Sequence, residues 1–285
     1  MQAKFCAVNH HESQAIKWTN RNRALAICAR FAYLYFARSG DVELLPTSHS
    51  YMRTLAAEPL FYLPSENFFI LAASADVFVV ADDIQFSTSG SFNRAQIKTV
   101  AGATWLTIPV LSKGRGRQRL DTVEIDNNRP WQRQHWRSIE FNYHNAPYFG
   151  EMGEALAPLY QHPYRNLANA AWDFLLLLWN TLGFEKSPSR TSELGVKGTG
   201  EKRLVALAAK MNADIYLAQE KYRAALRPER LQGIQLRLVN LGLPPYHQQY
   251  SMFIPGLNIL DLLFNEGIAF ARERVRKLAA AARNA

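Results

Sequence analysis

The sequence predicts an α/β fold, with a mostly parallel sheet flanked by helices and a largely helical second half. Two observations predict it: the uninterrupted β-branched and aromatic run Val77–Ala81, and the alternation of such short runs with longer helical patterns. A continuous apolar strand is typical of a parallel sheet covered on both faces. Strands that alternate with helices are typical of βαβ units. A chain of 285 residues is long enough to bury a core of this kind.

The first part of this body opens at Met52 with a strand-like run that ends in a proline turn. A helix is predicted next, with Ser65 as its N-cap and Phe68, Phe69 and Leu71 on its apolar face. A basic, glycine-rich loop at 112–118 separates two further predicted strands. The predicted elements are a helix at 65–73, strands at 77–81, 105–111 and 122–125, and helices at 131–143, 152–160 and 167–182, the last ended by Gly183.

A link at 187–200 that contains serine, proline and glycine precedes the second part. There the sequence predicts a helix at 201–210, strands at 214–218 and 234–239, and a helix at 258–282 with a basic, alanine-rich second half. We divide the chain into an N-terminal extension at 1–51, an α/β domain at 52–267 and a basic C-terminal helix at 268–285. We expect Met52 to lie close to the true start, with the extension accessory or non-native.

Composition limits the partners. The net charge of +9 favours an anionic small molecule, a nucleic acid or a membrane surface. The densest basic cluster, Lys113 to Arg119, has no aromatic residue interleaved with it, so nucleic-acid binding is disfavoured. No apolar run approaches the roughly 18 residues of a membrane span. Both cysteines, Cys6 and Cys28, precede the body, so thiol chemistry is excluded from it and a reducing cytoplasm is expected.

The first candidate site follows the strand at 77–81, because ligands of open α/β sheets bind beyond the carboxyl ends of strands. Two carboxylates stand there, and an amide-rich and cationic stretch suited to a sugar or phosphate follows them. The candidates are Asp82 and Asp83 as catalytic residues, and Gln85, Asn93, Arg94 and Lys98 as substrate-binding residues. The alternative is a solvated loop in which one aspartate caps a turn.

The second candidate site is the helix at 131–143, where Trp131, His135 and Ile139 share one face. His135 is a candidate general acid or base, because its unperturbed pKa is about 6.5. The more common alternative for a histidine beside a tryptophan is a hydrogen-bonded structural residue. Asn142 and Tyr143, at the end of this helix, are candidate substrate-binding residues.

Two further segments add candidate substrate-binding residues. Ser192 and Glu193 precede a glycine-bracketed helix start, where backbone N–H groups can hold an anion, although a linker is the alternative. Tyr246 and Gln248 lie in a polar segment before the apolar helix that contains Asp261. The sequence lacks a Walker A loop, a G-x-S-x-G elbow, a Rossmann glycine pattern and paired histidines at metal spacing. No metal site is therefore predicted.

These segments, in this order, resemble the WbqC-like protein family. The stretches that carry the resemblance fall between Asp76 and Gly267 and include "ADVFVVADDIQF", "IEFNYHNAPYF", "PYHQQ" and "FIPGLNILDLLFNEG". The resemblance implies a bacterial protein of O-antigen or surface-polysaccharide synthesis. It further implies a transferase that adds glycine or another acyl group to a sugar. One departure stands out: members usually open with His-Gln-Pro and Tyr-Phe-Pro, where this chain has Ala57-Glu58-Pro59 and Tyr62-Leu63-Pro64.

Together these observations favour a cytoplasmic transferase, acting on a nucleotide-activated amino sugar. Arg94 and Lys98 are expected to neutralise diphosphate charge, while Asp83 or His135 removes a proton from the attacking amine. A fainter similarity of Ile84-Gln85-Phe86 to adenylate-forming ligases makes an amide ligase that uses ATP with Mg²⁺ the second version. The alternatives are a non-catalytic nucleic-acid or scaffold-binding protein, and a catalytically degenerate paralogue.

Overall fold

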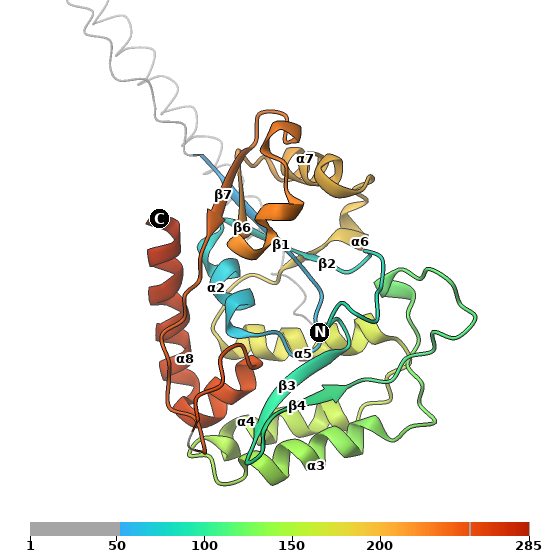
Figure 1. The fold of residues 1–285 in the computed structure, drawn as a ribbon, viewed down its shortest axis with the longest axis vertical. Helices are drawn as coiled ribbons and strands as arrows, with labels where there is room; N and C mark the ends of the chain where they lie inside the picture. Colours follow the sequence, from blue (N-terminus) through green and yellow to red (C-terminus); the bar gives the residue numbers. More distant parts are fainter. Residues whose placement is uncertain (1–51, 251, 285) are drawn as a thin grey trace, which may run out of the picture. The chain divides into compact units, whose positions relative to one another are not determined.

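The computed structural model describes residues 52–250 and 252–284, so the expectation for residues 1–51 lies outside the described part of the chain. A five-stranded sheet with flanking helices forms the centre of this part, which confirms the predicted fold class (Figure 1). The strands lie in the order β5-β2-β1-β6-β7, and every neighbouring pair in this sheet is parallel. The strands are β1 (Thr54–Pro59), β2 (Val77–Ala81), β5 (Ser189–Arg190), β6 (Ile215–Gln219) and β7 (Gln235–Val239).

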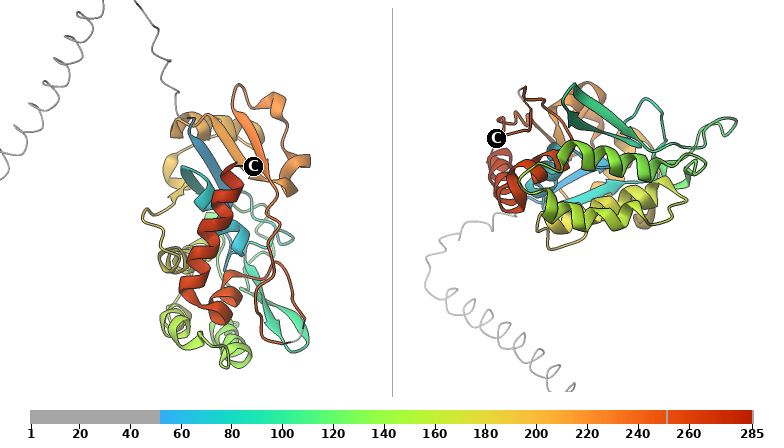
Figure 2. Two further views of the ribbon diagram at one scale, coloured as in Figure 1. Left: turned by 90° about the vertical axis from the view of Figure 1, so that its left-hand side faces the viewer. Right: turned by 90° about the horizontal axis from the view of Figure 1, so that it is seen from below.

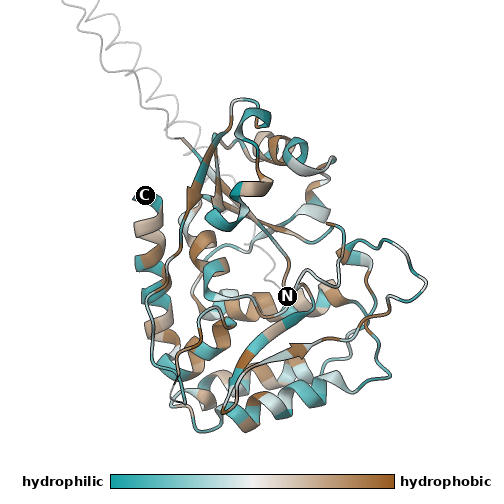
Figure 3. Cartoon of the chain, in the orientation of Figure 1, coloured by the Kyte–Doolittle hydropathy of each residue, from teal (hydrophilic) through white to brown (hydrophobic). Residues whose placement is uncertain are grey.

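The apolar pattern of each strand explains its place between two layers of helices. Ala56 and Val80 point into the larger core, which contains side chains of α2 (Glu66–Ser74), α5 (Leu167–Thr181) and α8 (Ile259–Asn284). Leu55 and Val79 point to the other face, where they pack with α7 (Gly200–Met211). Figure 3 shows α5 as a mainly apolar helix, as expected for one buried against the sheet. The predictions for the helices at 65–73, 167–182 and 201–210 are confirmed to within a few residues.

An antiparallel hairpin stands apart from the main sheet. It consists of β3 (Arg94–Thr99) and β4 (Gly102–Thr107), with Gln96 opposite Trp105. The hairpin lies beside α3 (Trp131–Tyr143) in Figures 1 and 2. Tyr143 of that helix accepts a hydrogen bond from the backbone N–H of Lys98 at 2.8 Å. Since β1 runs toward the hairpin, the carboxyl edge of the sheet faces β3.

The remaining elements are short. A helix, α4 (Phe149–Leu156), continues into a 3₁₀ turn (Ala157–Tyr160), and a single helical turn, α6 (Thr191–Leu194), follows β5. The other 3₁₀ turns are Leu120–Thr122, Glu220–Ala225 and Pro228–Arg230.

The sequence predictions were wrong in four places. The stretch from Arg94 to Thr99 was assigned to a loop, but it forms β3. Its polar sequence gives little indication of a strand, and the strand forms because it pairs with the antiparallel strand β4. The strand predicted at 105–111 is displaced to 102–107. The strand predicted at 122–125 is absent from the described residues; a 3₁₀ turn precedes single bridges at Glu124 and Ile125. The helix predicted at 152–160 begins and ends earlier, at 149 and 156.

The final helix is bent at one residue. Gly267 has φ of 83°, a conformation that glycine adopts without strain. A Cβ at this position would lie 2.8 Å from the ring of Tyr148, so the close approach of α8 to that ring also requires glycine. Beyond the bend, Ala271, Val275 and Ala279 remain buried in the larger core. The division into segments at 52–267 and 268–285 stays a prediction.

Candidate functional site

A cavity lies at the carboxyl edge of the sheet, between β1 and β6. The chain continues from β1 to β2 on one side, while β6 is the neighbour on the other side, so strand order reverses here. Ligands of open α/β sheets bind at such switch points. Glu58 near the end of β1 and Gln219 at the end of β6 both line the cavity, whose volume is about 210 Å³. We call it the switch-point cavity.

Glu58 is the buried acid of this cavity. Its side chain accepts hydrogen bonds from Nε2 of Gln219 at 2.7 Å and from the hydroxyl of Tyr222 at 3.0 Å, and only 1% of the residue is exposed. Burial raises the pKa of Glu58 above its usual value, although the charge of Lys221 and the two hydrogen bonds act in the opposite direction. A carboxylate with a raised pKa is better suited to accept a proton than an exposed one.

The hairpin supplies the opposite wall. Arg94 and Gln96 lie two residues apart and therefore on the same face of β3, and Trp105 of β4 is the pairing partner of Gln96. All three residues line the cavity. The guanidinium of Arg94 stacks over the indole of Trp105 at 4.6 Å from the ring centroid. The Nε atom of Arg94 is buried without a hydrogen-bond partner among the described residues. The wall therefore presents a cation, held in place by an aromatic ring, next to an exposed part of that ring.

Asp82, one of the predicted catalytic residues, joins the end of β2 to Arg190 and Ser192 through hydrogen bonds. It is fully buried and accepts hydrogen bonds from Nε of Arg190 at 2.8 Å and from the N–H and hydroxyl of Ser192 at 2.9 and 2.6 Å. Burial acts to raise the pKa of Asp82, but the hydrogen bonds from Ser192 and the ion pair with Arg190 together hold it below its usual value. A carboxylate stabilised in this way is a weak base.

Asp83 and its neighbours show the same kind of pairing. Asp83 accepts a hydrogen bond from Thr191 at 2.5 Å and forms an ion pair with Arg203. The structure thus brings together three predicted residues, Asp82, Asp83 and Ser192, but as a clamp between β2 and α6. Glu193 and Gln85 are exposed near this clamp. None of these five residues lines the switch-point cavity.

A second group of predicted residues gathers around Asp261 in the interior. Lys98 donates to Oε1 of Gln248 at 3.1 Å and to the carbonyl oxygen of Met252. Tyr143 and Tyr246 donate to the two oxygens of Asp261 at 2.8 and 2.7 Å. Lys98 is 2% exposed, so this group joins β3, α3 and α8 instead of binding diphosphate from solvent. Arg94 lines the switch-point cavity, and its phosphate-binding role stays a prediction, whereas the amine of Lys98 is bound within the fold.

Two predicted asparagines are also engaged within the fold. Asn93 is buried and donates to the carbonyl oxygen of Ile108 at 2.7 Å, which fixes the start of the hairpin. Asn142 donates to the carbonyl oxygen of Ser138 in its own helix at 2.7 Å. Neither of the two asparagines lines the switch-point cavity.

His135 lies in an aromatic part of the core. Its Nε2 lies 3.2 Å from the carbonyl oxygen of Thr107 and therefore donates to it, and its Nδ1 lies 3.0 Å from the hydroxyl of Tyr62. Burial lowers the pKa of His135 to about 4, although the bond to Thr107 acts in the opposite direction. The imidazole is therefore neutral, with both nitrogens occupied. This arrangement matches the structural alternative, in which the imidazole is held by hydrogen bonds within the core.

The low pKa of His135 leads to a prediction about acid stability. The pKa is about 6.5 in an unfolded chain, so the protein loses stability as pH falls from about 6.5 to about 4, where the folded state still excludes the proton. The shift of about 2.5 units corresponds to about 3 kcal/mol. Urea denaturation at pH 7.0 and 4.5 measures this loss, and a His135→Gln variant is expected to lose less.

The variant separates this effect from that of the buried carboxyl groups. The pKa values of Glu58, Glu66 and Asp261 are raised by burial, so these groups contribute stability in the opposite sense as pH falls. They titrate in both proteins and cancel in the comparison. Equal acid losses in the wild type and in His135→Gln would show that His135 accepts a proton without cost.

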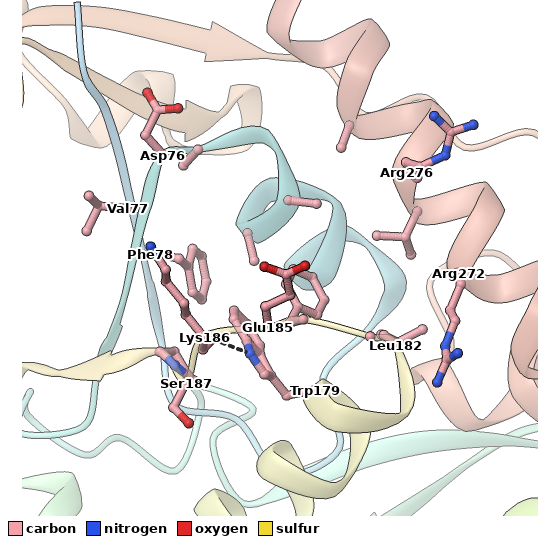
Figure 4. Close-up of a pocket in the computed structure, with 18 of the residues that line it drawn as sticks. Asp76, Val77, Phe78, Trp179, Leu182, Glu185, Lys186, Ser187, Arg272 and Arg276 are labelled. Atoms are coloured by element: carbon pink, nitrogen blue, oxygen red, sulfur yellow. Dashed lines mark hydrogen bonds between the residues drawn. The ribbon is translucent and has the colours of Figure 1, made fainter. Parts of the chain in front are cut away.

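A larger cavity lies at the other edge of the sheet. It has a volume of about 1030 Å³ and lies among the start of β2, the end of α5 and the second half of α8 (Figure 4). Two arginines of this cavity donate hydrogen bonds to carbonyl oxygens at the ends of helices. Arg272 donates to the carbonyl oxygen of Thr181, and Arg283 donates to those of Ala73 and Ser74. Arg276 pairs with Glu273. Because these cations are engaged, size alone does not make this cavity the candidate active site.

Neither a metal centre nor a membrane span is found in the part of the chain that the structure describes. Within 52–250 and 252–284, no three His, Cys, Asp or Glu side chains gather as a set of metal ligands. Over the same residues, no helix combines the length and apolar character that crossing a bilayer requires.

Comparison with known proteins places this chain among relatives. The model of the WbqC-like protein family matches residues 61–273, which is well over half of the chain. The chain belongs to the WbqC-like protein family. It is also 31% identical over 220 residues to an uncharacterized protein of Mycobacterium tuberculosis, an alignment that covers 76% of this chain and 95% of that protein. No solved structure matches the chain.

The family match covers only part of the switch-point cavity of this WbqC-like protein. Arg94, Gln96 and Trp105 lie inside the matched residues, whereas Glu58 precedes them. Sequence reasoning assigned no site role to Trp105, Gln219 or Tyr222. The signal for Glu58 was its place in Ala57-Glu58-Pro59, where family members usually have His-Gln-Pro. Gln219 and Tyr222 carried no local signal, because their role depends on the pairing of β6 with β1.

Proposed function

We propose that this WbqC-like protein is a transferase that attaches an acyl group to the amino group of a nucleotide-activated sugar in surface-polysaccharide synthesis. The observation that carries the proposal is the buried carboxyl of Glu58 in a cavity whose opposite wall holds Arg94 stacked on Trp105. The cavity thus combines a proton acceptor with a cation, the two groups that an amine and a diphosphate require. The implied role of family members in polysaccharide synthesis supports the choice of substrate.

The size of the switch-point cavity sets how the substrate lies. Drug-sized ligands occupy pockets of roughly 300 to 1,000 Å³, whereas this cavity has about 210 Å³. It therefore accommodates a sugar ring but not a whole nucleotide sugar. The diphosphate lies at the rim, near Arg94 and the exposed Lys221, and the nucleoside extends over the surface. The indole of Trp105 provides a flat apolar surface for the sugar ring.

The chemistry requires an activated acyl donor such as a thioester. The amine nitrogen attacks the carbonyl carbon of the donor, so a C–N bond forms and the C–S bond breaks. Glu58 takes the proton that the nitrogen loses, and this proton then passes to the departing thiolate. The amine must be uncharged when it attacks, so the ammonium form first loses one proton to solvent, and Glu58 accepts the second proton as the C–N bond forms.

The first test is binding. Replacing Arg94 with alanine is expected to weaken the binding of a nucleoside-diphosphate amino sugar about tenfold or more, since a hydrogen bond to a charged group contributes about 1.5 to 3 kcal/mol. Calorimetry or thermal shifts with UDP- and dTDP-linked amino sugars measure the change. Parallel titrations with ATP and Mg²⁺ test the ligase version.

The matched control for this test is Arg137→Ala, which removes an exposed arginine of α3 that does not line the switch-point cavity. It is expected to leave the affinity unchanged. An unchanged affinity in Arg94→Ala would contradict the proposed placement of the diphosphate.

The nucleic-acid alternative receives less support from the surface. In the loop at 112–118 and just beyond it, Arg115 pairs with Glu124 and Arg119 with Asp121. In the basic part of α8, Arg274 pairs with Glu66, and Arg276 pairs with Glu273. Cations neutralised in this way release fewer counterions on binding phosphates. A short RNA in the same titrations tests this alternative, since its affinity would fall steeply with added salt.

A further inference from the structure

A second cavity adjoins the switch-point cavity. It has a volume of about 270 Å³ and lies between the start of α2, residues from 241–246 and 253–258, and the start of α8. Ser65, Gly256 and Asn258 line both cavities, so these three residues form the boundary between them. We call the second one the side compartment.

The charges of the side compartment cancel. Glu66 and Arg274 are its charged lining residues, and they form an ion pair with 2.6 Å between Oε1 and Nε. Arg274 donates in addition to the carbonyl oxygen of Pro244 and stacks over the ring of Tyr246. Both members of the pair are buried, with 9% and 6% of their side chains exposed. A charged ligand would find no counter-charge here, so the compartment suits an uncharged group.

The rest of the lining combines aliphatic and aromatic side chains with the polar residues Ser65, Asn67, Tyr246 and Asn258. Leu241, Leu243, Leu257 and Leu262 contribute aliphatic surface. Asn67 also lines the compartment, and its Oδ1 atom is buried without a hydrogen-bond partner among the described residues. A buried acceptor that stays unpaired is costly, and a turn of the Asn67 amide toward the compartment would let a donor of the ligand satisfy it. The lining is therefore suited to bind an aliphatic group that carries one O–H or N–H donor.

We propose that the side compartment binds the acyl group, and that this group is a short, uncharged aliphatic chain with a hydroxyl or amide donor, such as a 3-hydroxyacyl chain. This inference rests on the proposed function, because the sugar nitrogen must lie in the switch-point cavity for its acyl group to reach past Ser65 and Asn258. At roughly 30 Å³ for each water-sized group, a volume of 270 Å³ holds up to about nine non-hydrogen atoms. Longer chains do not fit.

The test compares four probes on the full chain: UDP-glucosamine and its N-acetyl, N-butyryl and N-(3-hydroxybutyryl) derivatives. Burial of the added methylene groups is expected to make the butyryl probe bind at least tenfold more tightly than UDP-glucosamine. The hydroxyl is expected to add a further threefold to tenfold, about the value of one hydrogen bond. Dissociation constants are measured by calorimetry at one salt concentration.

An Asn67→Ala variant checks the origin of the selectivity. The ratio of the butyryl and hydroxybutyryl dissociation constants is expected to fall to about one, and a loss of fold would not change this ratio selectively. Asn180→Ala, an exposed asparagine of α5, is the matched control and should keep the wild-type ratio. Equal binding of acylated and unacylated sugars, or an unchanged ratio in Asn67→Ala, overturns this inference alone. Binding of none of the four probes overturns the proposed function as well.

Discussion

Replacing Asp82 with alanine is expected to lower the free energy of unfolding by about 3 to 5 kcal/mol, because it leaves a buried cation without its carboxylate. Asp82 is fully buried, and its partner Arg190 has only 18% of its side chain exposed. The substitution also removes the acceptor for the N–H and hydroxyl groups of Ser192. These contacts join β2 to residues more than a hundred positions later, so their loss acts on the whole edge of the sheet.

Urea denaturation measures this effect, with Asp121→Ala as the matched control. Asp121 pairs with Arg119, whose side chain is 57% exposed, and an exposed pair of this kind contributes about 0.2 to 1 kcal/mol. The melting temperature of Asp82→Ala is expected to fall by roughly 6 to 20 °C, from about 2 to 4 °C for each kcal/mol in a chain of this size. Similar losses in the two variants would contradict a role for Asp82 as the central acceptor of the clamp.

Acid provides an independent check on Asp82. The hydrogen bonds from Ser192 and the pairing with Arg190 outweigh burial and hold its pKa below the usual value. A carboxyl whose folded pKa is lowered contributes stability above its unfolded pKa and loses it as pH falls through the folded pKa. The difference between wild type and Asp82→Ala is therefore expected to shrink at pH values below about 4.

The sequence predicted most of the scaffold because its central elements have strong local patterns. Val77–Ala81 is apolar throughout, and the helix before Gly183 has a long apolar face and a glycine at the expected end. The exception is β3, whose sequence RAQIKT does alternate, with Arg94, Gln96 and Lys98 on one face, but contains only one large apolar side chain, Ile97. It forms a strand because it pairs with β4, and this pairing cannot be read from the sequence of β3 alone.

The candidate site was harder to predict for a similar reason. The sequence favoured ligand binding by three charged residues, Asp82, Asp83 and Lys98, because no residue near them in the sequence was expected to pair with their charges. Their partners lie more than a hundred residues away, at Arg190, Arg203 and Gln248. Arg94 differs, since its contact with Trp105 is local to the hairpin and both residues line the cavity. Charge type was readable from the sequence, but charge compensation required the fold.

The fold also explains which residue of the usual His-Gln-Pro opening corresponds to Glu58 in the stretch 57–59 of this chain. Ala57 packs on the face of the sheet that carries α7, whereas Glu58 points to the opposite face, toward Gln219. Glu58 therefore does not occupy the place of the usual histidine. It stands where relatives usually have glutamine, so this chain has an ionisable acid where an amide is common. Because an amide is not a base, the proposed role of Glu58 as proton acceptor is particular to this chain, and Glu58→Gln, which restores the usual amide, tests it directly.

Glu58→Gln is expected to lower the rate of acyl transfer by roughly a hundredfold to ten-thousandfold, the usual contribution of a positioned base. Glutamine has nearly the same shape as glutamate, so binding of the nucleotide sugar is expected to change little. The loss should therefore appear in kcat and not in the dissociation constant. Glu220→Gln, an acid on the turn that follows β6 and pairs with Arg223, is the matched control and should retain the full rate.

The pH profile distinguishes a base from a structural acid. Burial raises the pKa of Glu58, so the wild-type rate is expected to rise with pH through a value above 4.5 as the carboxyl loses its proton. That acidic limb should disappear in Glu58→Gln, which has no proton to lose at this position. A variant that keeps both the rate and the limb would show that Glu58 only supports Gln219 and Tyr222. The acceptor of the amine proton would then have to be sought elsewhere along the carboxyl edge of the sheet.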